Sequence, residues 1–191
     1  MPIRIAINGF GRIGRSALKI ALSHKDAQVV AINDLGDVEN LAYLLRFDSV
    51  YGRYSADVQV DGSALVVGGK TIKVLQEKDP AQLPWKDMNI DVVIESTGFF
   101  TDEEGARKHI DAGAKHVVIS APTKSESIAT VVMGVNDDQL VGKDIVSNAS
   151  CTTNCAAPVM AVLHNTFGVE KALLTTAHAY TATQSIVDGP A

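Results

Sequence analysis

Two residues in the second half of the sequence have the types needed for nucleophilic catalysis. Cys151 stands where a predicted strand meets a predicted helix, so its thiol faces the positive end of the helix dipole and its pKa is expected to fall. His178 ends the next predicted strand, which a helix–strand crossover could return to Cys151. A thiol beside an imidazole is a nucleophile paired with a base. We therefore predict a Cys–His pair.

The surroundings of this pair carry almost no charge. Residues 145–169 include no Asp, Glu, Lys or Arg, and Glu170 and Lys171 are the only such residues up to position 187. A membrane span needs ~20 predominantly apolar residues, and the hydroxyl and amide side chains in this run exclude one. We predict that the charge-free run surrounds a buried polar site.

The two cysteines allow other interpretations. Both could be buried packing residues, since free cysteine is often buried, or they could form a redox pair one helical turn apart. Zinc fits poorly because Cys-x-x-x-Cys stands without a second ligand pair, so no metal site is predicted. We expect Cys155 to be a packing residue. The remaining histidines are expected at the surface or, for His164, half-buried on a helix; the surface candidates are His24, His109 and His116.

A glycine motif near the N-terminus predicts a dinucleotide site. Gly9, Gly11 and Gly14 form Gly-x-Gly-x-x-Gly between a predicted strand and a predicted helix. Glycines at these places allow a tight turn, close approach to a pyrophosphate and close helix–strand packing. The unpaired N–H groups of the helix N-terminus then face the phosphates.

Asp34 lies twenty residues beyond Gly14, at the end of the next predicted strand. An acid there can accept hydrogen bonds from ribose hydroxyls and repel a 2′-phosphate. Because no arginine follows at positions 35–37, NAD is favoured over NADP. The alternative is that Asp34 only caps a loop and the glycines only form a turn.

Alternating strands and helices predict the fold class. Short β-branched runs at 3–8, 28–33, 91–97, 116–120, 129–135 and 144–150 alternate with helical patterns, and glycines divide residues 56–75 into hairpins. This order predicts an α/β protein with a Rossmann-type, mostly parallel sheet and helices on both faces. We assign it to an NAD-binding domain at residues 1–150. A helix at 151–167 and a strand at 169–179 would begin an α+β catalytic domain, incomplete at 151–191.

Composition narrows the class of protein. The chain has 191 residues, a formal charge of -5, 46% hydrophobic and 20% charged residues, which are ordinary values for a globular protein and exclude wholesale disorder. No basic cluster indicates nucleic-acid binding. Two cysteines do not form a disulfide scaffold, and the N-terminus lacks a long apolar secretory core. We expect a cytoplasmic, reducing location.

Three motifs carry a specific resemblance. INGFGRIGR at 7–15, NASCTTN at 148–154 and HAYTATQ at 178–184, followed by DGP at 188–190, resemble phosphorylating glyceraldehyde-3-phosphate dehydrogenases. The resemblance runs from residue 3 to residue 190. It implies NAD-dependent oxidative phosphorylation of glyceraldehyde 3-phosphate to 1,3-bisphosphoglycerate, through a cysteine thiohemiacetal and thioester. It also implies inorganic phosphate as co-substrate and a homotetramer, with no nucleic-acid or membrane partner.

The resemblance implies a role for each matching residue. Arg12 and Ile13 would approach the pyrophosphate and Asp34 the adenosine ribose. Lys78, where the family often has arginine, would lie near the adenine, and Ser120 would line the nicotinamide side. Cys151 would be the nucleophile and His178 its base, while the two phosphates would be held by Ser150, Thr152 and Thr181.

The resemblance also raises a doubt about activity. Ala191 falls inside the loop that follows Thr181 in the family, so the family's phosphate-gripping arginines and nicotinamide-orienting asparagine are not among these residues. We expect the 191-residue chain alone to be inactive or nearly so, with an open edge on the strand at 169–179. The alternatives are an NAD-binding module without turnover, a Cys151–Cys155 thiol sensor, and an erythrose-4-phosphate dehydrogenase.

Overall fold

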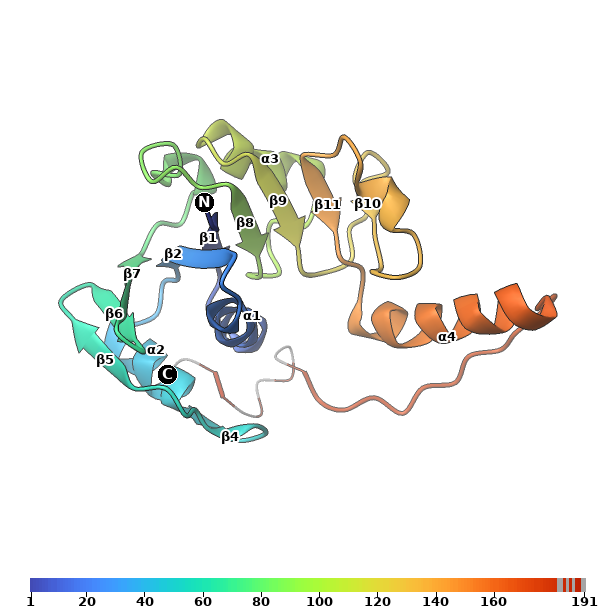
Figure 1. Ribbon diagram of the computed structural model, residues 1–191, viewed down its shortest axis with the longest axis horizontal. Helices are drawn as coiled ribbons and strands as arrows, with labels where there is room; N and C mark the ends of the chain where they lie inside the picture. Colours follow the sequence, from blue (N-terminus) through green and yellow to red (C-terminus); the bar gives the residue numbers. More distant parts are fainter. Residues whose placement is uncertain (182–183, 185, 187, 190–191) are drawn as a thin grey trace.

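The computed structural model describes residues 1–181, 184, 186, 188 and 189. Within them, the central feature is a nine-stranded sheet in the order β10-β11-β9-β8-β1-β2-β7-β6-β5 (Figure 1). Seven neighbouring strands run parallel: β1 (Ile3–Asn8), β2 (Ala27–Asn33), β7 (Lys70–Leu75), β8 (Val92–Glu95), β9 (His116–Ile119), β10 (Ala129–Thr130) and β11 (Ile145–Ser147). The predicted mostly parallel sheet is confirmed.

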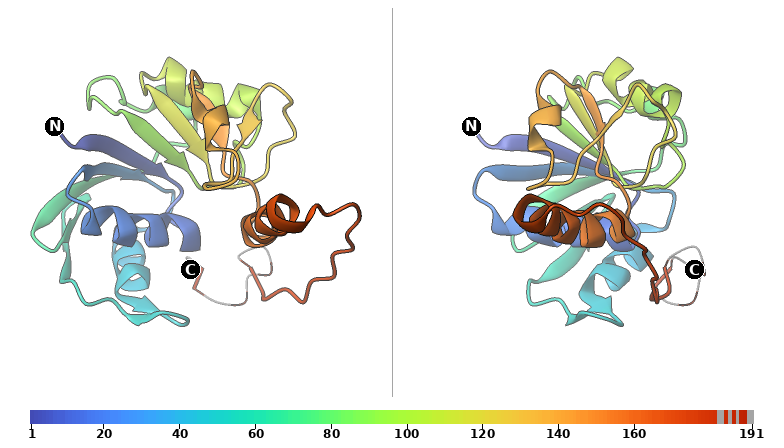
Figure 2. Two further views of the ribbon diagram at one scale, coloured as in Figure 1. Left: turned by 45° about the vertical axis from the view of Figure 1, so that its right-hand side comes forward. Right: turned by 90° about the vertical axis from the view of Figure 1, so that its right-hand side faces the viewer.

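Helices cover both faces of this sheet, as predicted (Figure 2). One face packs against α1 (Arg12–Ser23) and α2 (Val38–Arg46), and the other packs against α3 (Glu103–Asp111). Successive side chains of a strand point to opposite faces, so Ile7 belongs to the first apolar cluster and Ala6 to the second. The sheet is therefore buried on both sides, as a parallel sheet requires.

Two antiparallel strands extend the sheet at the β7 edge. β5 (Val58–Asp61) pairs with β6 (Ala64–Val67), and β6 pairs with β7. The turns between them contain Gly62 and Gly68, with φ of 57° and 56°, a left-handed conformation that favours glycine. The predicted glycine-divided hairpins are confirmed. A two-stranded ribbon, β3 (Phe47–Asp48) with β4 (Gly52–Arg53), follows α2, and 3-10 turns occupy Pro80–Gln82 and Asp137–Leu140.

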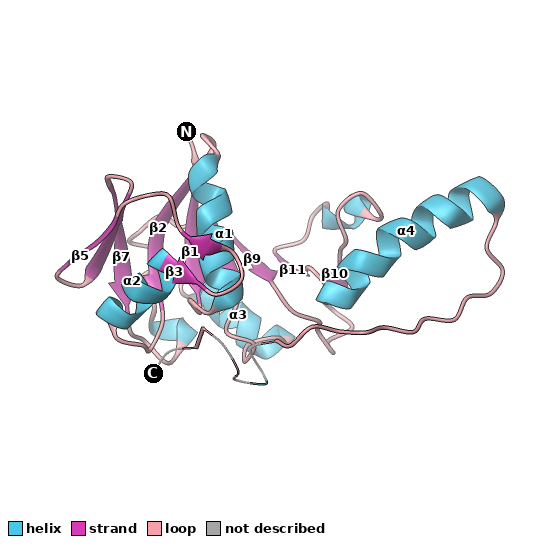
Figure 3. Cartoon of the chain, turned by 90° about the horizontal axis from the view of Figure 1, so that it is seen from below, coloured by secondary structure: helices cyan, strands magenta, loops and turns pink. Residues whose placement is uncertain are grey.

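After β11 the chain leaves the sheet and forms α4 (Cys151–Phe167), with the predicted bounds. Ser150 is its N-cap and accepts a hydrogen bond from the backbone N–H of Thr153, while Gly168 ends it in a left-handed conformation. None of its residues is buried. Figure 3 shows α4 projecting away from the sheet, followed by a long loop that returns toward the first helices. Among the described residues, no helix is long and apolar enough to cross a membrane.

The predicted strand at 169–179 is wrong. The structure assigns no strand to these residues, and most of them are exposed, including Leu173 and Leu174. A strand is stable only when its N–H and C=O groups pair with a neighbour, and none of the described segments pairs with this one. The second part of the predicted fold is therefore represented by α4 alone within the described residues.

Candidate active site

The predicted site residues follow the carboxyl ends of parallel strands, at one edge of the sheet. Lys78 comes after β7, Asp34 after β2, Gly9 after β1, Ser120 after β9 and Cys151 after β11. Because the sheet order is β7-β2-β1-β8-β9-β11, these residues occupy the edge in that sequence. The strand order reverses between β1 and β8, and open α/β sheets bind ligands at such a point. The topology therefore gives one continuous candidate site.

Two glycines of the phosphate loop are required by close packing. Gly9 has φ of 89°, and a Cβ there would lie 2.6 Å from the backbone nitrogen of Thr97. A Cβ on Gly14 would lie 2.1 Å from the carbonyl oxygen of Gly9. Real Cβ atoms do not approach other atoms this closely, so larger residues would push α1 away from β1 or the loop away from Thr97.

The start of α1 at Gly11 is open. Gly11 is the N-cap of α1 without a side-chain cap, and a Cβ on it would meet nothing within 4 Å. The first N–H groups of a helix have no intrahelical partner, and here Arg12 and the exposed Ile13 supply two of them. The geometry thus leaves the donors of the α1 N-terminus open to an anion.

The Arg12 side chain is engaged by carboxylates. Its Nη1 donates to Asp188 Oδ2 at 2.5 Å, and its Nη2 donates to Asp48 Oδ1 at 3.3 Å. Burial lowers the pKa of Arg12, but the two carboxylates outweigh it and the pKa is raised overall. Within this cluster, Arg12 offers a ligand its backbone N–H, while its guanidinium ties the loop to residues 48 and 188.

Arg15 is a site residue that the sequence analysis missed. Its side chain is buried, and Nη1 donates to the carbonyl oxygen of Phe10 at 2.9 Å while Nη2 donates to that of Asp188 at 2.8 Å. It therefore holds the phosphate loop from beneath. The signal available in the sequence was a second arginine one helical position beyond Gly14, inside an otherwise small and apolar face.

Asp34 caps the phosphate loop. Its Oδ2 accepts the backbone N–H of Phe10 at 2.6 Å, and its Oδ1 accepts that of Gly36 at 2.8 Å. Each carboxylate oxygen has a further lone pair, and the residue is half-buried, so ribose hydroxyls can still reach it. The exposed Lys78 lies at the same corner, because the Asp34 N–H donates to the carbonyl oxygen of Leu75 at the end of β7.

Cys151 and His178 meet across the loop that follows α4. The Sγ of Cys151 lies 3.2 Å from Nε2 of His178, whose Nδ1 lies 2.6 Å from the carbonyl oxygen of Ala179. A carbonyl only accepts, so Nδ1 carries a proton and Nε2 is the atom that exchanges a proton with the thiol. The hydrogen bond from His178 lowers the pKa of Cys151, and the N–H of Thr152 adds to the effect. The Ala179 carbonyl and the thiolate raise the pKa of His178. Both shifts favour a thiolate–imidazolium pair.

The predicted burial of this pair is wrong. Cys151, Cys155 and His178 are exposed, so the charge-free run does not surround a buried site among the described residues. The expectations for Cys155 as a packing residue and for His164 as half-buried are also wrong, because both side chains are exposed. The expectation for His109 is wrong in the opposite direction, because this residue is fully buried between α3 and the sheet rather than at the surface.

The residues predicted to hold phosphates make local hydrogen bonds. Ser150 Oγ caps α4, and Thr181 donates from N and Oγ1 to Gln184 Oε1 at 2.5 and 2.9 Å. Thr152 lies half-buried in the first turn of α4, and Ser120 donates its N–H to the carbonyl oxygen of Glu95 at 2.9 Å. Their roles toward a ligand remain predictions.

The turn before Cys151 has an unusual backbone that the sequence analysis did not single out. Ala149 is buried and has φ of 60°, a conformation rare for a residue with a Cβ and common at functional sites. Asn154 Nδ2 clamps this turn by donating to the carbonyl oxygens of Asn148 at 2.6 Å and Ser150 at 3.0 Å. The clamp aims the first turn of α4, and with it Cys151, away from the end of β11.

Comparisons with known proteins match both parts of the chain. The sequence model described as the NAD binding domain of glyceraldehyde 3-phosphate dehydrogenase matches residues 3–103, and the one described as its C-terminal domain matches residues 150–191. The glyceraldehyde-3-phosphate dehydrogenase of Eremothecium gossypii is 55% identical over 98% of this chain and 56% of its own length. Glyceraldehyde-3-phosphate dehydrogenase 1 of Bacillus subtilis is 52% identical over 100% of this chain and 57% of its own length. The cytosolic enzyme of Trypanosoma brucei brucei is 54% identical over the same shares. The chain thus spans little more than half the length of these relatives.

Proposed function

The chain belongs to the glyceraldehyde-3-phosphate dehydrogenase family, and we propose that it serves the NAD-dependent oxidation and phosphorylation of glyceraldehyde 3-phosphate to 1,3-bisphosphoglycerate. One observation carries the proposal: the sheet order arranges an acid, a glycine loop, a serine and a cysteine nucleophile along one edge. A dinucleotide lying along this edge would extend from a ribose site at Asp34 toward the thiol of Cys151.

Each part of the edge has a role toward NAD. Asp34 accepts the adenosine ribose hydroxyls, with Lys78 nearby for the adenine. Gly9, Gly11 and Gly14, with the N–H groups of Arg12 and Ile13, hold the pyrophosphate at the start of α1. Ser120 lies three strands from β2 in the sheet order, about 14 Å at the usual strand spacing, and lines the nicotinamide side. When bound, NAD supplies the hydride acceptor.

Cys151 and His178 perform the covalent chemistry. Nε2 of His178 takes the thiol proton, and the thiolate attacks the aldehyde carbon to form a thiohemiacetal on Sγ. The Cys151 N–H at the start of α4 and the protonated His178 stabilise its oxyanion. Oxidation gives an acyl thioester. Attack by an inorganic phosphate oxygen on the acyl carbon then breaks the C–S bond, forms the acyl phosphate and returns the Cys151 thiolate.

The two phosphates are assigned to hydroxyl groups near the nucleophile. Ser150, Thr152 and Thr181 offer such groups, and the charge-free run around them leaves the thiolate undisturbed by fixed charges. Hydroxyls alone bind phosphate weakly, because charged donors make the stronger hydrogen bonds. We therefore expect the 191-residue chain to bind NAD but to turn over substrate slowly or not at all.

The wider assignments follow from the family. Residues 1–150 form the NAD-binding domain, and residues 151–191 belong to the catalytic domain. The protein acts in the cytoplasm as a homotetramer; the name of the Trypanosoma brucei brucei relative includes "cytosolic". The exposed position of Cys151 and His178 favours a second candidate, an NAD-binding module without turnover.

Calorimetric titration with NAD tests the cofactor assignment. We expect saturable binding that Asp34→Asn weakens about tenfold, since the charge-assisted bonds to the ribose are lost. In the same variant the ratio of NAD affinity to NADP affinity should decrease, because the charge that repels a 2′-phosphate is lost. Asp37→Asn, which removes the charge of an exposed neighbouring acid, is the matched control and should leave both affinities unchanged. A wild-type chain that binds no NAD would overturn the proposal.

Turnover separates the two candidates. NADH formation is followed with glyceraldehyde 3-phosphate and inorganic phosphate, using the wild-type chain and Cys151→Ser. Phosphate-dependent NADH formation that disappears in Cys151→Ser supports the dehydrogenase. NAD binding without NADH formation supports the binding module for the chain by itself. Replacing the substrate by erythrose 4-phosphate in the same assay tests the sister activity.

A further inference from the structure

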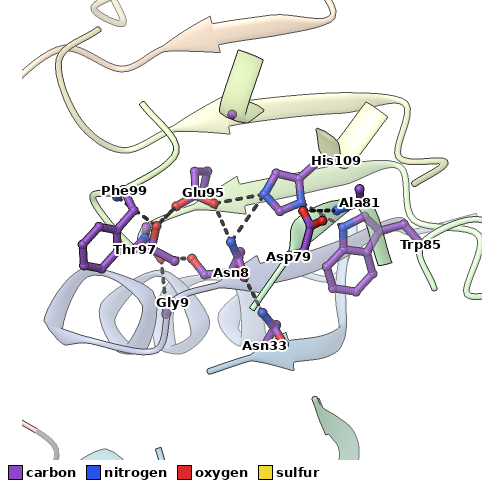
Figure 4. A network of polar contacts seen from close by, with 12 residues as sticks. Asn8, Gly9, Asn33, Asp79, Ala81, Trp85, Glu95, Thr97, Phe99 and His109 are labelled. Atoms are coloured by element: carbon purple, nitrogen blue, oxygen red, sulfur yellow. Dashed lines mark hydrogen bonds and ion pairs between the residues drawn. The ribbon is translucent and has the colours of Figure 1, made fainter. Parts of the chain in front are cut away.

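Two buried polar centres adjoin the candidate site. In the first, Glu95 accepts a hydrogen bond from Asn8 and lies 3.0 Å from Nε2 of His109, whose Nδ1 accepts from the indole of Trp85 (Figure 4). All four of these residues are buried, so this centre satisfies the core of the sheet. The second centre is Ser147, which is 0% exposed and is the last residue of β11. It stands directly before the turn that leads to Cys151, so its hydrogen bonds bear on the nucleophile.

The Ser147 hydroxyl joins two loops at the carboxyl edge of the sheet. Its Oγ lies 3.1 Å from the backbone nitrogen of Ala149 and 2.7 Å from the carbonyl oxygen of Ala121. An N–H only donates and a carbonyl only accepts, so Oγ accepts from Ala149 and donates to Ala121. The turn before Cys151 is therefore tied to the loop that follows β9.

Asn154 holds the same turn from the side of α4. Its Nδ2 lies 2.6 Å from the carbonyl oxygen of Asn148 and 3.0 Å from that of Ser150. Because carbonyl oxygens only accept, the amide must present its nitrogen here, and each of its two hydrogens has an acceptor. The peptide between residues 148 and 149 is thus held at both ends, its C=O by Asn154 and its N–H by Ser147.

This turn needs such support. Ala149 has φ of 60°, and a left-handed conformation costs free energy in a residue with a Cβ, so surrounding contacts must maintain it. No residue of α4 is buried, so packing contributes little to fixing the direction of the helix. Besides the N-cap bond of Ser150, the hydrogen bonds of Ser147 and Asn154 are the contacts that set where the first turn points.

The direction of the first turn matters for the thiol. The pKa of Cys151 is lowered by His178 and also by the backbone N–H of Thr152. An N–H at a helix N-terminus stabilises a thiolate only while it points at the sulfur. Among the described residues the titratable group in contact with Cys151 is His178, and residues 145–169 include no Asp, Glu, Lys or Arg. Geometry rather than fixed charge is therefore left to tune the thiol.

We propose that Asn154, together with Ser147, is a positioning residue for the nucleophile: the two side chains hold the strained turn at Ala149 from opposite sides and keep the N–H groups at the start of α4 directed at the sulfur of Cys151. The proposal rests on the proposed function, in which Cys151 is the nucleophile. It extends that site to two side chains that contact neither the thiol nor His178.

The test measures how fast iodoacetamide alkylates Cys151 as a function of pH, in a Cys155→Ser parent chain in which Cys151 is the single thiol. Asn154→Leu keeps the size of the side chain, removes both donors and changes no charge. Since the N–H groups of α4 would no longer be held against the sulfur, the midpoint of the profile should rise. The rate at pH 7 should fall about two- to fivefold, and the rates should converge above about pH 9.

The matched control is Asn165→Leu, the same substitution at an exposed position in the last turn of α4. It should leave the profile of the parent chain unchanged. Asn154 is exposed as well, so its replacement opens no cavity and the variant should fold. An Asn154→Leu chain with reduced stability but an unchanged profile would indicate a merely structural role and overturn the proposal.

A second variant tests the other side of the turn. Ser147→Ala removes the acceptor of the Ala149 N–H, so it should move the profile in the same direction as Asn154→Leu does. A folded Ser147→Ala chain with the parent profile would overturn the part assigned to Ser147.

The parent chain separates this proposal from the proposed function. A parent profile with the midpoint of an ordinary thiol, near ~8.5, would overturn the Cys–His chemistry and the positioning role with it. A lowered midpoint in the parent that is the same in Asn154→Leu would overturn the positioning role alone.

Discussion

The two parts of the chain are held in place by different means. Residues 1–150 bury apolar clusters on both faces of the sheet, whereas α4 buries no side chain and residues 169–181 are largely exposed (Figures 1 and 3). The dinucleotide edge is therefore built by core packing. The Cys–His pair is instead built by a helix cap, a strained turn and two hydrogen bonds of His178.

Because of this difference, NAD affinity and thiol reactivity depend on different parts of the chain. Packing fixes Gly9, Asp34 and Glu95 to within the small tolerance of a close-packed interior. The Cys151–His178 contact joins two exposed side chains, and exposed ion pairs contribute little to stability. We therefore expect core substitutions in the first part to change folding and NAD binding strongly, and substitutions in the second part to leave NAD affinity unchanged and to change folding much less.

The largest difference in the free energy of unfolding is expected when a leucine is replaced by alanine in each of the two parts. Leu18 on α1 is fully buried, and Leu163 on α4 is 39% exposed. Leu18→Ala should lower the free energy of unfolding by about 2–5 kcal/mol, because it removes apolar contacts and leaves a cavity. Leu163→Ala should change it by less than about 0.5 kcal/mol. Urea denaturation of both variants checks the comparison, and equal losses would contradict it.

A glycine pair sharpens the comparison at the level of binding. Gly14→Ala places a methyl group against Gly9, which should cost about 1–3 kcal/mol of stability and weaken NAD strongly. Gly168→Ala, at the left-handed end of α4 with open space around it, should cost about 1 kcal/mol. Its NAD affinity, measured by calorimetry, should equal that of the wild type. A Gly14→Ala chain with normal NAD affinity would show that the phosphate loop does not contribute to the NAD site.

The smallest effect on folding, but a clear one on reactivity, is expected at His178. The pKa of Cys151 is lowered chiefly by this histidine. Iodoacetamide should therefore alkylate Cys151 at pH values at which a free thiol is still mostly protonated and reacts slowly. In His178→Asn the thiol pKa should rise again, leaving only a few per cent thiolate at pH 7 and a roughly tenfold slower reaction there. The rates should converge above about pH 9, where both thiols are ionised.

The sign of this pH dependence follows from the two shifts. A lowered thiol pKa means that the rate stays high as the pH falls and drops only below that pKa. The raised pKa of His178 keeps the imidazolium beside the thiolate over a wider range. Cys155 in the same helix, labelled in a Cys151→Ser chain, is the internal control. A pH profile of Cys151 equal to that of Cys155 would contradict the pairing.

Much of the first part was predictable from local pattern. Short β-branched runs and the turn glycines at 62 and 68 indicated the strands and hairpins, because burial on both faces and positive φ each demand particular residue types. The spacing of Gly9, Gly14 and Asp34 indicated the dinucleotide edge. The predicted bounds of α4 also agree with the structure, which shows a serine cap at its start and a left-handed glycine at its end.

Other features depended on contacts that no local pattern contains. The segment at 169–179 has the composition of a strand, yet a strand exists only beside a partner. His109 lies among charged neighbours on α3, and its burial against Trp85 and Glu95 follows from how that helix packs. Cys155 and His164 are exposed because, within the described part of the chain, no element covers α4 closely enough to bury any of its side chains.

The sequence by itself determined the residue types at each strand end, the glycine loop, the acid twenty residues beyond it and the cysteine at a helix N-terminus, since these need only neighbouring residues and chain direction. The tertiary structure alone decided which of them meet. Strand order placed Asp34 and Cys151 toward opposite sides of the phosphate loop, because parallel pairing joins segments far apart in the chain. Packing buried Glu95 and His109 together, because a charge enters a core only where distant donors converge on it.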